Sequence, residues 1–305
     1  MSVARNKSTF ASWLELLRVP NLLTVPGDPV AGYLLAMQAD ASLRFSILAV
    51  AAASVCFYAA GLLLNDLHDL EIDRCQRPER PLPSSRIAVP EAVIALAILL
   101  GAGIGLCATA GLRALLAGLL LVTAIVTYNL FLKNVPLVGA LGMGLCRGLS
   151  LLLGWAAYRF FTPVSLRIAI AACTLTLYVA AVTVIARHET EKSKYNWRFI
   201  LPAAVVGAGL VFFRHIAQSP PLMTELAQLV LLVVIVLKTV SAPARTILAG
   251  ARTPQLVGSM LRTLIPLQAF FILGSQNGAA AWLGGVVVLA LWPIASILSR
   301  RFYMS

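Results

Sequence analysis

The sequence predicts an all-α membrane protein, a polytopic bundle of nine or ten transmembrane helices. The 305 residues are 60% hydrophobic and 12% charged, with a mean hydropathy of +0.88, whereas roughly 25% of the residues in a soluble domain are charged. Apolar runs near the ~20 residues that cross a bilayer recur along the chain. Lys and Arg alternate in density between successive loops, which is typical of membrane proteins.

The expected elements follow one another without a visible repeat, so we interpret residues 1–305 as a single membrane domain. Residues 1–19 have too few apolar residues for a span and no signal-peptide cleavage site, so we expect a helix on the membrane surface. The run at 254–274 is the weakest span, because Arg262 and Pro266 could place it partly in the interface. The expected spans are 20–39, 43–64, 88–110, 112–132, 135–158, 164–186, 199–216, 222–240, 254–274 and 279–299.

The net charge of +12 could suggest a nucleic-acid partner, but its distribution indicates membrane topology instead. With the N-terminus inside, nineteen Lys and Arg residues fall on the inner side and five on the outer side, as the positive-inside rule requires. We therefore expect membrane lipids and no nucleic acid as partners. We place the protein in a bacterial inner (plasma) membrane, with its active site facing the cytoplasm.

The five cysteines are dispersed and four lie in apolar spans, so neither a disulfide framework nor a zinc site is predicted.

An acidic cluster follows the second expected span in the sequence NDLHDLEIDRCQRPERPLP. Asn65, Asp69 and Asp73 recur every four residues, and Asp66 and Asp69 are three apart, so a helix would place their oxygens on one face. Carboxylates stacked in this way repel one another unless a cation binds them, and oxygen ligands favour Mg²⁺ held together with substrate phosphates. The simpler alternative is a solvated helix end. The arginines that could neutralise phosphate oxygens are Arg74, Arg77, Arg80 and Arg86.

Asp28 lies inside the first expected span, where a charged side chain is costly. It should face the bundle interior. One interpretation is a contact to the polar head of an acceptor, together with Asn21. The alternatives are an internal pair with a basic residue such as Arg147, or a cap beside Pro26 and Gly27.

The segment NDLHDLEID followed by RCQRPERPLPSS resembles the first aspartate-rich motif and Arg-Pro loop of the UbiA superfamily of intramembrane prenyltransferases. The stretch from Leu17 to Ala36 resembles the first helix of that family. The segment that starts at Tyr128 resembles the part of the family that supplies Tyr128, Lys133 and Arg147. The resemblance spans most of the chain, although 200–305 matches mainly in hydropathy.

A second aspartate motif of that family is altered here, in the sequence VTVIARHETEKSKYN. Ala186 stands at the first acidic position, which leaves Glu189 and Glu191 as the carboxylates, while Lys192 and Lys194 are gained. The lysines could replace part of the charge of a second Mg²⁺; the alternative is a degraded, inactive site. The pattern resembles the UbiA-like EboC subgroup.

The resemblance implies Mg²⁺-dependent transfer of a prenyl group from a prenyl diphosphate to a small-molecule or lipid acceptor. It implies three sets of site residues. The catalytic and metal-binding set is Asn65, Asp66, Asp69, Asp73, Glu189 and Glu191; the diphosphate-binding set is Asn65, Arg77, Arg80, Lys133, Arg147, Lys192 and Lys194; the acceptor-binding set is Asn21, Asp28 and Tyr128. Two alternatives stay open, an isoprenoid-phosphate binding or transport protein without turnover, and a transferase that uses a polyprenyl phosphate as acceptor.

Overall fold

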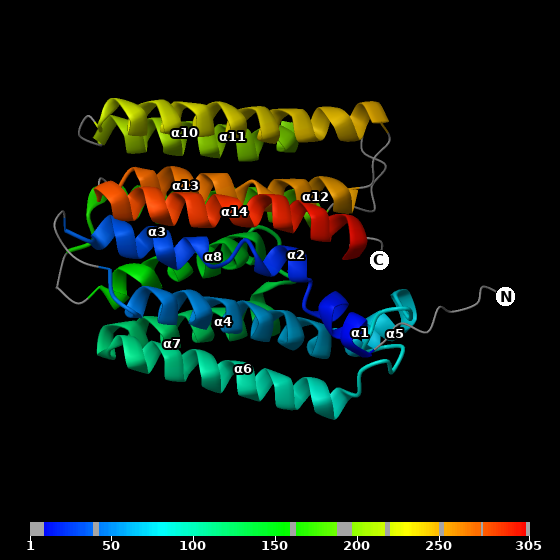
Figure 1. Cartoon of the computed structure of the whole chain (residues 1–305). Coiled ribbons are helices and arrows are strands. Elements are labelled where there is room, and N and C mark those ends of the chain that lie inside the picture. The colour runs from blue at the N-terminus through cyan, green and yellow to red at the C-terminus, as the bar shows by residue number, and fades with distance from the viewer. Residues whose placement is uncertain are drawn as a thin grey trace.

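The computed structural model describes residues 9–38, 43–158, 163–187, 197–216, 220–249, 253–275 and 277–302. In these ranges the long helices lie side by side in stacked layers (Figure 1), and nine of them are long and apolar enough to cross a membrane. The helices before the polar loop are α1 (Thr9–Leu16), α2 (Val19–Leu22), α3 (Gly27–Ala36), α4 (Ser46–His68) and α5 (Leu70–Gln76). Those that follow are α6 (Val89–Ala110), α7 (Leu112–Thr127), η1 (Tyr128–Leu132), α8 (Val138–Ala157), α9 (Leu166–Arg187), η2 (Trp197–Ile200), α10 (Leu201–Ile216), α11 (Leu222–Ala249), α12 (Thr253–Arg262), α13 (Leu264–Leu273) and α14 (Gly278–Phe302).

The predicted all-helical membrane bundle is confirmed, but the first expected span is interrupted. Within this run, α2 ends at Leu22 and α3 begins at Gly27 after a turn from Leu23 to Pro26, and neither helix is long enough to cross a bilayer alone. Pro26 fixes its own φ and cannot donate a backbone hydrogen bond, so it opposes a continuous helix. Ten apolar runs therefore give nine long spanning helices among the described residues.

The run predicted to be weakest lies in the interior. Its two halves, α12 and α13, are separated at Thr263, and every residue of α13 is buried. Arg262 ends α12 rather than interrupting α13. The interfacial placement considered for this run is therefore wrong for its second half, since α13 is covered by α3, α11 and α14. The sequence alone does not show this covering.

Small residues allow α8 to approach its neighbours closely at the centre of the bundle. A Cβ at Gly154 would lie 1.9 Å from the carbonyl oxygen of Pro29 on α3, and one at Gly144 would lie 2.1 Å from that of Thr176 on α9. Backbones this close are typical of membrane bundles. The outer surfaces of α6, α7, α10, α11 and α14 carry exposed apolar side chains, as expected where helices meet lipid.

Candidate functional site

The acidic cluster lies at the junction of α4 and α5, at one end of the bundle (Figure 1). Asn65 and Asp66 occupy the last turn of α4, Asp69 is the residue between the helices, and Asp73 is in α5. The amide of Asp69 donates to the carbonyl of Asn65 (3.0 Å), and that of Asp73 donates to the carbonyl of Asp69 (2.8 Å). Bonds between residues four apart therefore continue across the junction, as the spacing predicts.

Each aspartate of the cluster forms an ion pair with a cation from a different segment. The three cations come from the turn after α1, the Arg-Pro loop and the segment after η1. Each cation offsets the repulsion between its own aspartate and the other two carboxylates, so no single cation has to bridge all three. The pairs are Arg18 Nη2 with Asp66 Oδ1 at 2.9 Å, Arg80 Nη1 with Asp73 Oδ2 at 2.6 Å, and Lys133 Nζ with Asp69 Oδ1 at 2.5 Å.

The ammonium of Lys133 also lies 3.5 Å from Oδ1 of Asn65. One cation therefore bridges an amide oxygen and a carboxylate oxygen. In the described part of the chain, no three His, Cys, Asp or Glu side chains are placed to hold a metal together. Mg²⁺ usually needs only one or two carboxylates plus waters and substrate phosphates, so the donors at Asn65 and Asp69 fit such an ion.

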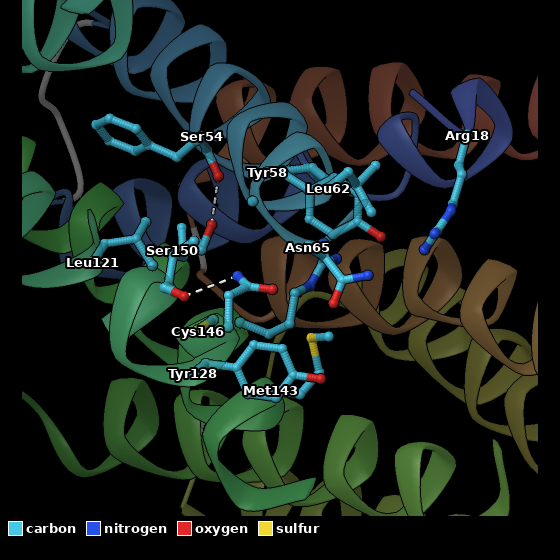
Figure 2. A pocket seen from close by; sticks show the side chains of 16 residues that line it. Arg18, Ser54, Tyr58, Leu62, Asn65, Leu121, Tyr128, Met143, Cys146 and Ser150 are labelled. Atoms are coloured by element: carbon cyan, nitrogen blue, oxygen red, sulfur yellow. Dashed lines mark hydrogen bonds between the residues drawn. The ribbon is translucent and has the colours of Figure 1, made fainter. Parts of the chain in front are cut away.

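A cavity of about 240 Å³ begins beside the acidic cluster and continues between α4, α7 and α8. Figure 2 shows Arg18 and Asn65 toward one side of the cavity and Ser54, Ser150 and Leu121 toward the other. Arg18 and Asn65, at the acidic cluster, thus lie apart from Ser54, Ser150 and Leu121 in one cavity whose wall is mostly apolar. The lining residues are Arg18, Val25, Ser54, Phe57, Tyr58, Gly61, Leu62, Asn65, Leu121, Ile125, Tyr128, Asn129, Met143, Cys146, Arg147 and Ser150.

The hydroxyl groups of Ser54 and Ser150 hydrogen-bond to each other at 2.6 Å across the α4 and α8 interface (Figure 2). Around them the cavity wall is made of apolar side chains such as Phe57 and Ile125. The cavity can therefore hold an apolar chain whose polar end lies at the acidic cluster.

Asp28 lies in the bundle interior and pairs with Arg147, whose Nε is 2.9 Å from Asp28 Oδ2. Both side chains are buried, at 0% and 6% exposure. Gln268 of α13 donates to Asp28 Oδ1 (2.6 Å) and to the carbonyl of Thr24 (2.7 Å), which also accepts from Arg147. The internal-pair interpretation of Asp28 matches this geometry. Its predicted acceptor contact, and the diphosphate contact predicted for Arg147, remain predictions.

Two arginines considered for phosphate bind elsewhere. Arg74 pairs with Glu71 at 2.7 Å on the exposed side of α5. Arg86 donates to both carboxylate oxygens of Glu15 (3.1 and 3.2 Å) and to the carbonyl of Glu79 (2.6 Å). It therefore ties the Arg-Pro loop to α1.

The structure brings together Asn65, Asp66, Asp69, Asp73, Arg80 and Lys133 at one end of the bundle, and it places Tyr128 in the cavity wall beside them. Arg77 is exposed, and Asn21 is buried outside the cavity lining. The predicted residues Glu189, Glu191, Lys192 and Lys194 lie outside the described residues.

Sequence reasoning missed Arg18 as a site residue. Arg18 pairs with Asp66, 48 positions away, and lines the cavity. Its backbone has φ 46°, the left-handed region that a residue other than glycine rarely adopts. From sequence alone, an arginine just before an apolar span indicates only membrane topology.

Comparison with known proteins gives a consistent result. A family model described as the UbiA prenyltransferase family matches residues 29–251. The digeranylgeranylglyceryl phosphate synthase of Sulfurisphaera tokodaii is 34% identical over 147 residues, which are 48% of this chain and 52% of that protein. The chain thus matches about half the length of this relative.

Two solved structures share the fold. A UbiA homolog from Aeropyrum pernix K1, in its apo form, has a TM-score of 0.64 at 19% identity and covers 83% of this chain and 96% of that one. A UbiA homolog from Archaeoglobus fulgidus, bound to DMAPP and Mg²⁺, has a TM-score of 0.61 at 17% identity and covers 93% and 99% of the two chains.

Proposed function

The chain belongs to the UbiA prenyltransferase family, and from this premise we propose that it transfers a prenyl group from a prenyl diphosphate to a small acceptor. The reaction is Mg²⁺-dependent and takes place at the cytoplasmic side of the membrane, which we still predict to be a bacterial inner membrane. One observation carries the proposal. A row of oxygen donors from Asn65 to Asp73, contacted by cations from three other segments, stands beside a mostly apolar cavity that Asn65 itself lines.

This arrangement suits ionisation of an allylic C–O bond. The bond breaks with its electron pair moving to the diphosphate, so the leaving group gains negative charge as the prenyl cation forms. Arg18, Arg80 and Lys133 are already placed around the cluster, and preorganised cations stabilise such charge more in the transition state than in the ground state. Asn65 and Asp69 would hold Mg²⁺, which supplies further positive charge to the diphosphate oxygens.

The apolar part of the cavity would bind the isoprenoid chain. Phe57, Leu121 and Ile125 lie in its wall, and apolar side chains around the chain would keep away water that would otherwise react with a carbocation. The ends of the cavity thus divide the substrate between a charged head and an apolar tail.

The reported relatives support the donor class. The Archaeoglobus homolog was solved with DMAPP and Mg²⁺, and the Sulfurisphaera relative is named digeranylgeranylglyceryl phosphate synthase. Neither relative identifies the acceptor of this chain, and membership of the EboC subgroup remains a prediction.

A second candidate is a protein that binds or transports an isoprenoid phosphate without turnover. The altered second motif favours it, because Ala186 replaces an expected acidic residue at the end of α9. A third, a transferase that uses a polyprenyl phosphate as acceptor, would use the same cluster and cavity.

The test uses purified protein in detergent, labelled prenyl diphosphates of several lengths, Mg²⁺ and an acceptor-containing lipid extract. Wild-type protein should release diphosphate and form a new prenylated product, whereas Asp69→Ala or chelation of Mg²⁺ should abolish both. Arg74→Ala is the matched charge-removing control, because Arg74 pairs with Glu71 on the exposed side of α5, away from the aspartates. Equal release by wild-type and Asp69→Ala proteins would overturn the enzyme proposal, and persistent tight binding without release would favour the second candidate.

A further inference from the structure

The last residue of α9, Arg187, contacts the segment that carries Lys133. Its Nη1 donates to the carbonyl of Val135 at 2.9 Å, and its Nη2 donates to the carbonyl of Lys133. Both acceptors lie in the turn between η1 and α8. An arginine that donates to two carbonyls of one turn in this way restrains the backbone of that turn, since its planar guanidinium offers donors in a rigid fork.

The local backbone is shaped to admit this guanidinium. A Cβ at Gly139 would lie 2.3 Å from Nη2 of Arg187 and 2.5 Å from the carbonyl oxygen of Leu132. Leu137, two residues earlier, has φ 56°, a region that costs energy for a residue with a side chain. The close approach at Gly139 and the strained turn at Leu137 are both features that a substitution would disturb.

On its other side, the same turn presents the Lys133 ammonium to the acidic cluster. That ammonium is 2.5 Å from Asp69 Oδ1, and the side chain is only 9% exposed. A lysine side chain has four flexible carbons, so its ammonium is positioned reliably only when the backbone beneath it is held. Arg187 supplies that constraint.

We propose that Arg187 is a positioning residue, which holds the Lys133 turn so that the Lys133 ammonium remains at Asp69. The role rests on the proposed function, in which Lys133 contacts diphosphate. In this role Arg187, which lies at the altered second motif, binds backbone carbonyls and not a phosphate. The role therefore requires no second metal ion. The end of α9 would then act on the first acidic cluster through Lys133.

The first arm of the test does not depend on turnover. Lysines of the detergent-purified protein are modified by reductive methylation, and the rates are compared by mass spectrometry, with exposed Lys238 as the reference in the same molecule. Arg187→Ala should make Lys133 react about fivefold faster, because local opening frees the turn, while Arg74→Ala should change nothing. An unchanged Lys133 rate in Arg187→Ala would overturn the proposal.

The second arm measures kcat/KM for prenyl transfer in Arg187→Ala, Arg187→Gln, Lys133→Met and the double variant Arg187→Ala/Lys133→Met. Arg187→Ala should lose about ten- to a hundredfold, since small displacements of positioned groups have effects of this size. Arg187→Gln should recover part of the loss through its remaining donor. The double variant should be no worse than Lys133→Met alone, because both changes remove one interaction.

The outcomes separate the two proposals. The positioning role would be overturned if the two single losses in kcat/KM multiplied in the double variant and Arg187→Gln were as slow as Arg187→Ala. Arg187 would then act by its own charge on the substrate. A faster Lys133 reaction in Arg187→Ala, in a protein with no prenyl transfer in any form, would support the positioning contact and reject the proposed function instead.

Discussion

Two groups of carboxylates and cations lie in this molecule, one at the polar end of the bundle and one in its interior. At the end, Asp69 is 26% exposed and its partner Lys133 comes from the segment after η1. In the interior, Asp28 is completely buried and shares its partners with the Thr24 carbonyl. The two pairs are similar in distance, but the Asp69 carboxylate is partly exposed and the Asp28 carboxylate is fully buried, so only Asp69 is open to an ion from outside the bundle.

The largest expected effect comes from breaking the interior pair. Asp28→Asn leaves the Arg147 charge buried without a counterion, which should lower the free energy of unfolding by about 3–5 kcal/mol. Thermal unfolding in detergent, followed by tryptophan fluorescence, measures the change. Replacing both partners, in Asp28→Leu/Arg147→Leu, should recover most of the loss, because apolar pairs of similar volume are tolerated. A double variant as unstable as Asp28→Asn would contradict a purely structural pair.

The corresponding change at the polar end should affect activity rather than stability. Asp69→Asn should reduce kcat by about 10²–10³-fold, a size typical for removal of one preorganised electrostatic group, with little change in melting temperature. In contrast to the interior pair, the double variant Asp69→Asn/Lys133→Met should recover no activity. Steady-state kinetics with varied Mg²⁺ test this. Any recovery of activity in the double variant would show that Asp69 only neutralises Lys133 and does not itself act on the metal or the substrate.

Arg18→Gln should have a smaller effect. Its guanidinium pairs with Asp66 and lines the cavity, so loss of a charged hydrogen bond should weaken prenyl diphosphate binding by about ten- to a hundredfold, the equivalent of about 1.5–3 kcal/mol. Its side chain is 37% exposed, so stability should hardly change. Equilibrium binding of a labelled prenyl diphosphate measures the loss; unaltered affinity would remove Arg18 from the proposed site.

The smallest effect is expected for Arg74→Ala, which removes an exposed pair with Glu71. Stability should change by less than about 1 kcal/mol, and turnover should remain that of the wild-type protein. The same unfolding and kinetic measurements apply. A clear loss of activity would mean that the site extends along the exposed side of α5.

The bundle and the acidic cluster could be predicted from the sequence because both depend on local pattern. Apolar runs give spanning helices, and the spacing of Asn65, Asp69 and Asp73 survives the junction between α4 and α5. The interruption at Leu23–Pro26 was not predicted, because a hydropathy window averages over four residues. The interior position of α13 was not predicted either, since Pro266 and Arg262 suggest an interface when only the chain itself is considered.

The partners of the charged residues could not be assigned from local pattern. Arg18 reaches Asp66 over 48 positions and Gln268 reaches Asp28 over 240, and such separations are decided by helix packing. The family resemblance predicts a diphosphate contact for Arg147, yet in the structure Arg147 forms an ion pair with Asp28. Long-range pairing was therefore the main information that the structure added to the site.

The turn between α2 and α3 also has a consequence for biosynthesis. The Thr24 carbonyl at this turn accepts hydrogen bonds from Arg147 and from Gln268, the latter 244 positions later in the chain. A ribosome that makes the chain from its N-terminus therefore delivers the acceptor well before either donor. Since an unsatisfied polar group is costly in lipid, we expect the nascent first segment to remain near water or the insertion machinery until α8 and then α13 emerge.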